Sequence, residues 1–273
     1  MSKSLNELVV DINSMKIRGA NKIAIQSLKF LKTFSKKKGF GKDFQKAVKK
    51  LGKTRPTAVV LHNCLEIVKK QKDKETIDKL LRKLREAPRK IAERGRNLIK
   101  NGDSIMVHCH STEALGIIER AWRDKKKFKV YVTETEPRLQ GIITAKELAK
   151  RKIPIILIVD SAIEYFIKDV TMVLVGTDAM RKEGVVNKIG TYTMAVVAKE
   201  HKIPLYVAGN TLKLDKRKKF VIEERDPDEV YVEHMKTLEV RNPAFDITPW
   251  KYVKRVVTER GIMTPGNVKK MIR

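Results

Sequence analysis

The stretch "SIMVHCHSTEALGIIERAW" (104–122) passes from a short apolar run into a segment with helical spacing. The run "IMVHC" (105–109) has the length of a buried strand, and "TEALGIIERAW" (112–122) repeats apolar residues three and four positions apart. A strand that leads directly into a helix is the repeating unit of α/β folds. We therefore expect the chain after residue 102 to repeat this unit.

Four further apolar runs continue the pattern. They are "KVYVTE" (129–134), "IPIILIVD" (153–160), "MVLVG" (172–176) and "IPLYVAG" (203–209). Helix-like stretches such as "TAKELAKR" (144–151) and "GTYTMAVVAKEH" (190–201) lie between them. Unbroken aliphatic strands joined by helices predict a parallel sheet that is covered on both faces. Residues 103–273 are therefore expected to form one α/β domain.

The first hundred residues have helical spacing instead. The segments that show it are "LNELVVDINSM" (5–15), "KIAIQSLKFLKTF" (22–34), "TAVVLHNCLEIVKK" (57–70) and "KETIDKLLRKLREAPRKIAERGRNLI" (74–99). The second stops at "SKKKGFGK" (35–42), and Pro88 in the last predicts a kink or a helix start. We expect residues 1–102 to form a separate helical domain.

The 273-residue chain carries a formal net charge of +28 and only two cysteines, Cys64 and Cys109. Free thiols, no signal-peptide pattern and no apolar stretch of membrane length predict a cytoplasmic protein that does not span a membrane. The charge is typical of nucleic-acid binding, of an anionic substrate, or of a lysine-rich composition from a hot environment. Four glutamines and 6% aromatic residues favour the third interpretation, and nucleic-acid binding stays open.

Polar and reactive residues stand where the apolar runs end. These positions are Cys109, Glu134, Asp160, Asp178 and Gly209. In parallel α/β sheets, ligands bind in a crevice beyond the carboxyl ends of the strands. The residues at these ends are therefore the first candidates for chemistry.

Cys109 precedes a helix that Ser111 or Thr112 can cap. A helix N-terminus and nearby cations stabilise a thiolate, so Cys109 is a candidate base or nucleophile. A half-buried structural cysteine is the alternative, and the local residues leave both open. A zinc site is rejected, because adjacent strand residues point to opposite faces and His62 with Cys64 has no second chelating pair.

Asp178, in "VGTDAM" (175–180), is expected to open into the same crevice. A carboxyl in a partly apolar cleft keeps its proton to higher pH and can donate it, whereas helix capping is the alternative role. Asn187 and Lys188, in "NKIGTYT" (187–193), stand at a predicted helix start that suits an anion or simple capping. The chain has no Walker or dinucleotide-type glycine pattern, which argues against a nucleotide cofactor.

Two arginines in the helical half can clamp a phosphate. Arg18 lies in "KIRGANK" (16–22), where a glycine permits close backbone approach, and Arg55 lies in "TRPTAVVLHN" (54–63). Ordinary surface solvation is the alternative for arginines in so basic a chain.

These segments together resemble the family that joins methylthioribose-1-phosphate isomerase, archaeal ribose-1,5-bisphosphate isomerase and the regulatory subunits of translation initiation factor 2B. The segments are "IRGANKIA", "RPTAVVL", "VHCHSTEALGI", "VYVTETEPRLQGIITAKEL", "IPIILIVDSA", "VLVGTDAM", "VNKIGTYTMAVVAKEHKIPLYVAG" and "TLKLD". They cover most of residues 10–215 in order. The resemblance implies a helical N-terminal domain, a Rossmann-like C-terminal domain, no cofactor, and a dimer or hexamer.

The resemblance also implies roles for individual residues. Cys109 corresponds to the catalytic base and Asp178 to the catalytic acid of the isomerases. The implied substrate contacts are Arg18, Gly19, Ala20, Lys22, Arg55, Asn187, Lys188 and Lys213. The chain departs from the family pattern at Glu136, where the isomerases have arginine, and at Lys22, where the ribose-bisphosphate branch tends to have arginine.

The motifs "HCHS", "IRGA" and "TLKLD" resemble the ribose-bisphosphate branch most. The function that this implies is conversion of ribose 1,5-bisphosphate, a phosphorylated pentose, to ribulose 1,5-bisphosphate in an archaeal cytoplasm. Two alternatives remain: a non-catalytic regulatory subunit that binds initiation factor 2, and methylthioribose-1-phosphate isomerase.

Overall fold

The computed structural model describes residues 3–17, 19–55, 57–233 and 235–272. The chain divides into two compact units, Met1–Ala87 and Pro88–Arg273. The boundary falls inside a helix and not at residues 102–103. The reason is that Ile91 and Ile99 are fully buried in an apolar cluster with residues of the second unit.

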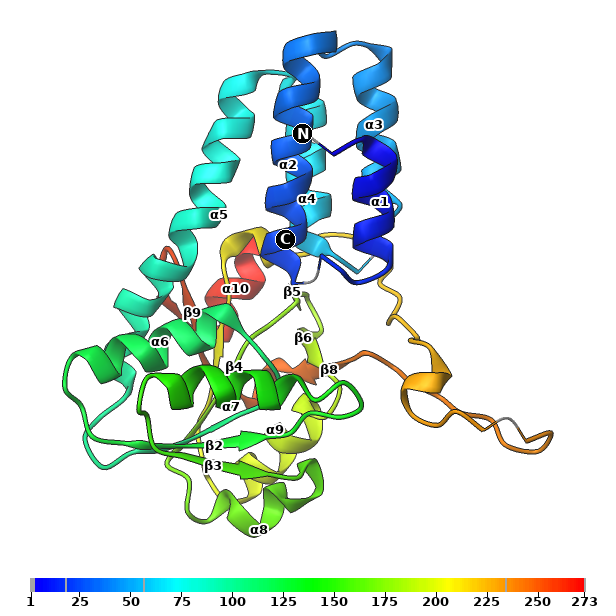
Figure 1. Ribbon diagram of the computed structural model, residues 1–273. Helices are drawn as coiled ribbons and strands as arrows, with labels where there is room; N and C mark the ends of the chain where they lie inside the picture. Colours follow the sequence, from blue (N-terminus) through cyan, green and yellow to red (C-terminus); the bar gives the residue numbers. More distant parts are fainter. Residues whose placement is uncertain (1–2, 18, 56, 234, 273) are drawn as a thin grey trace. The chain divides into compact units, whose positions relative to one another are not determined.

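The first unit is built from helices (Figure 1). They are α1 (Leu5–Asn13), α2 (Ala20–Lys38), α3 (Lys42–Gly52), α4 (Val59–Gln71) and most of α5 (Lys74–Gly95). Ser4 and Glu7 form a capping box that satisfies free amides at the start of α1. Leu28 and Leu31 of α2, Phe44 of α3 and Leu61 of α4 are almost completely buried and form part of the core. The expected helical domain is therefore present.

The helical spacing of residues 22–34 stops within residues 35–42 as predicted, because α2 ends at Lys38 with Gly39 as its C-cap. Helix α3, which was not predicted, follows with Phe44, Ala47, Val48 and Leu51 on its buried face. Pro88 does not start a helix, because α5 runs through it from Lys74 to Gly95, and a kink at Pro88 stays a prediction.

The second unit contains a seven-stranded sheet in the order β10-β9-β7-β4-β1-β2-β3. Its strands are β1 (Ser104–Val107), β2 (Lys129–Thr133), β3 (Ile155–Ile158), β4 (Met172–Val175), β7 (Leu205–Ala208), β9 (Val253–Thr258) and β10 (Gly261–Met263). Only the pair β9–β10 is antiparallel. All five apolar runs of the sequence form strands, which confirms the predicted α/β class.

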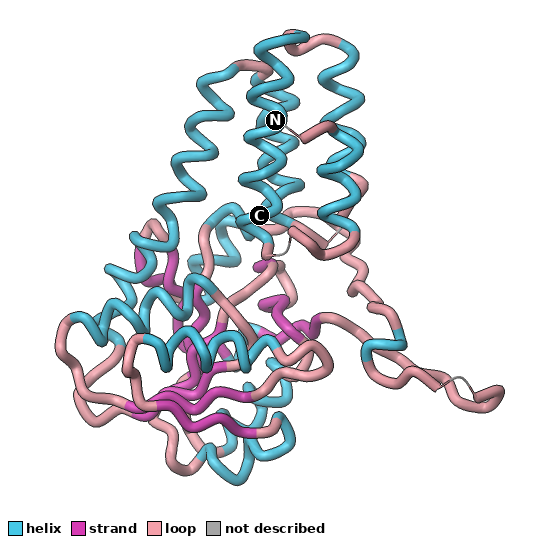
Figure 2. Tube along the Cα trace, viewed as in Figure 1, coloured by secondary structure: helices cyan, strands magenta, loops and turns pink. Residues whose placement is uncertain are grey.

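Helices cover both faces of this sheet (Figures 1 and 2). They are α6 (Thr112–Arg123), α7 (Gln140–Lys150), α8 (Ile163–Ile167), α9 (Thr191–Glu200) and α10 (Pro265–Ile272). Side chains of β1 alternate between the two layers, because Ile105 and Val107 pack with α6 and Met106 packs in the cluster that includes α8 and α9. The sheet is therefore buried on both sides, and only its strand ends are open to a ligand.

A small antiparallel sheet lies beside the main one and was not predicted from the sequence. It consists of β5 (Ala179–Met180), β6 (Gly184–Lys188) and β8 (Phe245–Pro249), in the order β5-β6-β8. Strands β5 and β6 form a hairpin directly after β4. This hairpin, and not a helix, follows Asp178.

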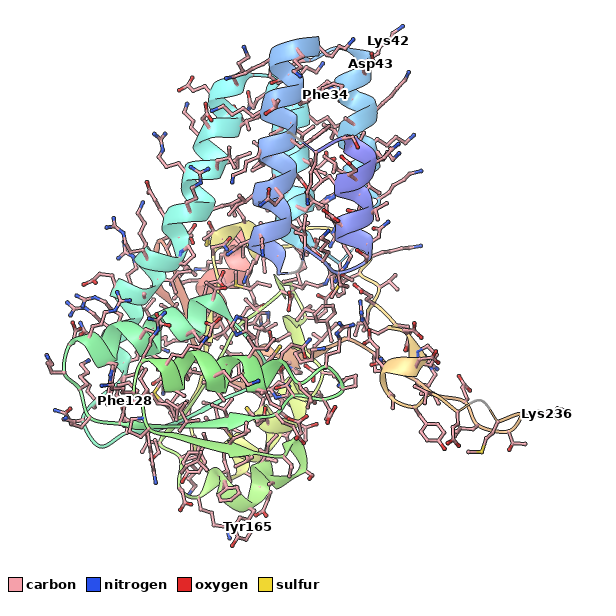
Figure 3. The ribbon with its side chains drawn as sticks, in the orientation of Figure 1. Phe34, Lys42, Asp43, Phe128, Tyr165 and Lys236 are labelled. Carbon is pink, nitrogen blue, oxygen red and sulfur yellow. The ribbon has the colours of Figure 1, made fainter. Side chains whose placement is uncertain are left out.

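Residues 216–233 and 235–242 form an arm before β8, with Lys236 near its far end (Figure 3). Buried ion pairs anchor its start, because Arg181 donates to Asp215 at 2.6 Å and Arg217 donates to the same carboxylate at 2.8 Å. Several apolar side chains of the arm face solvent, namely Val221, Val230, Val232, Met235 and Leu238. Within the described ranges, no helix is both long and apolar enough to cross a membrane.

Candidate active site

The site lies where the strand order of the sheet reverses. From β1 the chain moves to β2 and β3 on one side, whereas β4 and β7 lie on the other. In doubly wound sheets a crevice for ligands opens at this point, beyond the carboxyl ends of the strands. Cys109 follows β1 and Asp178 follows β4, so both flank the reversal.

Cys109 is half-buried and has a left-handed backbone, with φ of 66°. Its N–H donates to Thr135 Oγ1 at 2.9 Å, and its carbonyl accepts from Thr144 Oγ1 at 3.0 Å. Helix α6 begins three residues later, where the Ser111 side chain accepts from the Ala114 amide. Ser111 is thus the cap, one of the two residues that the sequence offered.

Burial opposes the thiolate form of Cys109 that a helix start and nearby cations would favour. Burial raises the pKa of Cys109 to about 11, against smaller lowering effects of Lys188 and the His110 amide. The charges of Asp178 and Asp160 raise the pKa further. Because desolvation outweighs the nearby cation, the thiol keeps its proton at neutral pH in the free protein.

Asp178 is half-buried, and its charge acts directly on Cys109. Its amide donates to the Val186 carbonyl at 2.8 Å, which closes the hairpin of β5 and β6. The alternative role as a helix cap is wrong, because a strand follows Asp178. Cys109 and Asp178 therefore lie near each other at one edge of the sheet, and a shared crevice stays a prediction.

Asn187 and Lys188 are buried at the end of β6. Asn187 donates to Thr191 Oγ1 at 3.0 Å, and the Lys188 charge reaches Cys109. Both residues precede α9, which begins at Thr191. Asp246 caps the first turn of α9 by accepting from the Tyr192 amide at 2.9 Å. Burial raises the pKa of Asp246 to about 6.

Lys213 follows β7 and is buried against a carboxylate. Its Nζ lies 3.0 Å from Glu113 Oε1, and Asn210 donates to the same oxygen at 3.2 Å. Glu113 stands in the first turn of α6, where a helix N-terminus favours negative charge. The ammonium of Lys213 is therefore fixed at the same edge of the sheet as Cys109.

His108 holds two loops of the site together. Its Nε2 lies 2.7 Å from the Ile189 carbonyl and its Nδ1 lies 2.7 Å from Thr133 Oγ1. A carbonyl can only accept, so Nε2 carries the hydrogen and Thr133 donates to Nδ1. Burial lowers the pKa of His108, which keeps the ring neutral at pH 7.

Acidic residues also crowd the ends of β2 and β3. Burial and the charges of Glu134 and Asp160 raise the pKa of the exposed Glu136. Arg138, the nearest substitute for the arginine that Glu136 replaces, donates to Glu229 at 2.6 Å.

Five of the predicted phosphate contacts belong to the first unit, and the structure describes four of them. Gly19, with φ of 88°, is the N-cap of α2 and provides no side-chain cap, and Ala20 is the first residue of the helix. Lys22 is exposed on that helix. Arg55 Nη1 lies 2.7 Å from Met15 Sδ, which places Arg55 beside the loop that leads into α2. The predicted residue Arg18 is outside the described residues.

Sequence reasoning missed the residues that support this site. Thr135 and Thr144 are completely buried polar side chains in the second unit. The sequence shows only a threonine after a strand and a threonine in a helix, and neither pattern indicates a supporting role. Among the described residues, no group of three or more His, Cys, Asp and Glu side chains is placed to hold a metal.

Comparisons with known proteins agree with this architecture. A sequence profile described as "Initiation factor 2 subunit family" matches residues 16–265. Ribose 1,5-bisphosphate isomerase of Archaeoglobus fulgidus is 40% identical over 279 aligned residues, which cover 95% of this chain and 89% of that protein. Methylthioribose-1-phosphate isomerase of Acetivibrio thermocellus is 35% identical, with 98% and 91% covered. The crystal structure of the Pyrococcus horikoshii OT3 translation initiation factor eIF-2B has a TM-score of 0.87 at 31% identity and covers 98% of this chain and 99% of that one.

Proposed function

This chain belongs to the initiation factor 2 subunit family, and from that premise we propose that it is an aldose–ketose isomerase that converts ribose 1,5-bisphosphate to ribulose 1,5-bisphosphate. One observation carries the proposal. A thiol and a carboxyl follow the neighbouring strands β1 and β4 closely enough for their charges to interact, and Lys188 acts on the same thiol. Relatives named for this reaction cover nearly the whole chain.

The proposed reaction moves protons only, so no cofactor takes part. Asp178 donates its proton to the ring oxygen as the sugar opens. Cys109, as thiolate, removes the proton from C2 and returns it to C1. The hydroxyl on C2 gives its proton back to Asp178 as the ketone forms, which restores the starting state of the carboxyl.

The charges around Cys109 suit this order of events. The Asp178 carboxylate is one of the groups that raise the thiol pKa. A proton on Asp178 removes this effect and leaves the lowering effect of Lys188, so the protonated acid and the thiolate base favour each other.

Two groups of residues are proposed to hold the phosphates. Asn187, Lys188 and Lys213 lie at the strand ends of the second unit. Arg18, Gly19, Ala20, Lys22 and Arg55 make up the group in the first unit, where the N-terminus of α2, whose N-cap Gly19 has no side chain, suits an anion. Binding of a phosphate by either group restricts the motion of the sugar and so favours the reaction.

The test is incubation of the purified protein with α-ribose 1,5-bisphosphate, with and without AMP, followed by phosphorus or proton NMR. We expect ribulose 1,5-bisphosphate to form. Cys109→Ser should lower turnover at least about a thousandfold, because a serine hydroxyl loses its proton far less readily than a thiol and cannot act as the base. The unfolding temperature should stay unchanged.

The matched control is the other cysteine. Cys64 is completely buried in α4, and Cys64→Ala should keep turnover within about threefold. Unchanged turnover in Cys109→Ser, or no ketose from the wild-type protein under any condition, contradicts the proposal.

Two relatives support the two alternative functions. The similarity to methylthioribose-1-phosphate isomerase favours the same chemistry on a different sugar phosphate. The structural similarity to a translation initiation factor favours a regulatory subunit that binds initiation factor 2. Turnover of methylthioribose 1-phosphate, or a pull-down of initiation factor 2 by a protein without isomerase activity, would select one of them.

We also propose that the protein acts as a homo-oligomer, a dimer or a hexamer. The apolar side chains on the arm at residues 216–233 and 235–242 support this, since exposed apolar patches on soluble proteins are typically covered by a partner.

A further inference from the structure

The backbone of Cys109 has a conformation that its surroundings must enforce. Residues other than glycine rarely adopt a positive φ, and the φ of Cys109 is 66°. Such residues persist where the neighbouring structure holds them in place, and they concentrate at functional sites. The two peptide groups that flank the Cys109 side chain are both bound by threonine hydroxyls.

Thr135 holds the amide side. Its Oγ1 accepts from the Cys109 N–H at 2.9 Å, and the side chain is completely buried. Thr135 itself has a φ of 65°, an unusual value for a β-branched residue. Asp160 fixes it there, because Oδ1 accepts from the Thr135 amide at 2.9 Å and Oδ2 accepts from the Glu136 amide at 2.7 Å.

Thr144 holds the carbonyl side from helix α7. Its Oγ1 donates to the Cys109 carbonyl at 3.0 Å and lies 3.1 Å from His110 Nδ1. The single hydroxyl hydrogen goes to the carbonyl, so the oxygen accepts from the His110 ring. Thr144 is completely buried, which excludes water as a substitute donor without a rearrangement.

We propose that Thr135 and Thr144 are positioning residues that clamp the Cys109 peptide in its left-handed conformation and thereby hold the thiol beside Lys188 and Asp178. The two hydroxyls come from different elements, the end of β2 and helix α7. A rotation of the Cys109 peptide groups would therefore break at least one of the two hydrogen bonds. A different backbone conformation at Cys109 would change the direction of its side chain and so its position relative to these charged groups. The inference rests on the proposed function, in which this thiol reacts.

The experiment removes each hydroxyl without changing the shape of the side chain. Thr135→Val and Thr144→Val are compared with Thr135→Ser and Thr144→Ser, which keep the hydroxyl. Two quantities are measured on the whole protein: isomerase kinetics, and the rate of iodoacetamide alkylation of Cys109 against pH, with the modified cysteine identified by peptide mass spectrometry.

In each valine variant we expect kcat to fall by about 10- to 100-fold with KM within about threefold, because displacement of a reacting group by about 1 Å costs this much. The pH midpoint of alkylation should fall from near 11 toward the ~8.5 of a solvated thiol as Cys109 leaves its buried position. Both serine variants should restore kcat to within about threefold.

The matched control is Thr248 on β8, which is also buried. Its Oγ1 has no hydrogen-bond partner among the described residues, so Thr248→Val removes a hydroxyl without removing a bond. This variant should leave both readouts at their wild-type values. The two clamp residues are tested separately, so if one valine variant fails to fold, the other still decides.

Valine variants that lose only thermal stability and keep the wild-type kcat and alkylation profile would overturn the inference. A wild-type protein that produces no ketose contradicts the proposed function, and the alkylation profiles still decide whether the threonines position the thiol.

Discussion

At Cys109, the ammonium of Lys188 opposes the burial that raises the thiol pKa to about 11. Lys188→Met should therefore raise this pKa further and slow alkylation at pH 9 by about threefold or more, because the largest stabilising charge is lost. The exposed Lys182, in the turn of the same hairpin, is the matched control. Lys182→Met should leave the rate unchanged, and an unchanged rate in Lys188→Met would show that the ammonium does not act on the thiol.

Individual reactive residues were predictable because they occupy strand ends. Cys109 and Asp178 each follow an apolar run, and the rule for parallel sheets places such residues at one edge. The protonation state of the thiol was not predictable. A sequence shows that Lys188 and a helix start are available, but it does not show how far the sulfur is removed from water.

Supporting residues were not predictable for a related reason. Thr144 lies in an amphipathic helix, where nothing distinguishes it from a surface threonine. Its function depends on a peptide thirty-five residues away, Cys109, whose unusual φ comes from tertiary contacts.

Helix α7 starts in direct contact with strand β2. A Cβ on Gly141 would lie only 1.6 Å from the Thr133 carbonyl oxygen. Gly141→Ala should therefore displace the helix and reduce the free energy of unfolding by about 3 kcal/mol or more. Denaturant unfolding followed by circular dichroism measures this change.

Gly116, inside α6, is the control for that substitution. An added Cβ there meets its nearest neighbour, the Ala92 side chain, at 3.5 Å, which is ordinary contact. Gly116→Ala should be neutral or stabilise by up to about 1 kcal/mol, since alanine favours the helix. Equal effects of the two alanines would contradict this account of α7.

The elements that the sequence revealed are those with strong periodicity. The five main strands and helices α6, α7 and α9 were predicted because their apolar residues repeat at the required spacing. The hairpin of β5 and β6 was missed, because β5 spans only two residues and cannot show an alternation. Strand β8 was missed as well, since its partner β6 is distant in the sequence.

In a single protomer, the apolar side chains of the arm are exposed to water. We expect light scattering to give at least twice the protomer mass of 31.3 kDa. Val232 is 69% exposed and Leu238 is 45% exposed, so replacing both by Asp should shift the mass toward one protomer. Lys236→Asp, on the same exposed arm, should leave the mass unchanged, and a single-protomer mass for the wild type would refute the oligomer.

The ion pairs of Arg181 and Arg217 with Asp215 have a consequence that depends on temperature. The cost of removing charges from water falls as temperature rises, whereas hydrophobic stabilisation per area levels off. These pairs join the hairpin turn after Asp178 to the segment after Lys213, and the Asp215 side chain is completely shielded from solvent. On heating, the contact between these two segments should therefore weaken less than the purely apolar packing of the surrounding helices, so that the geometry of the site is among the last features to be lost.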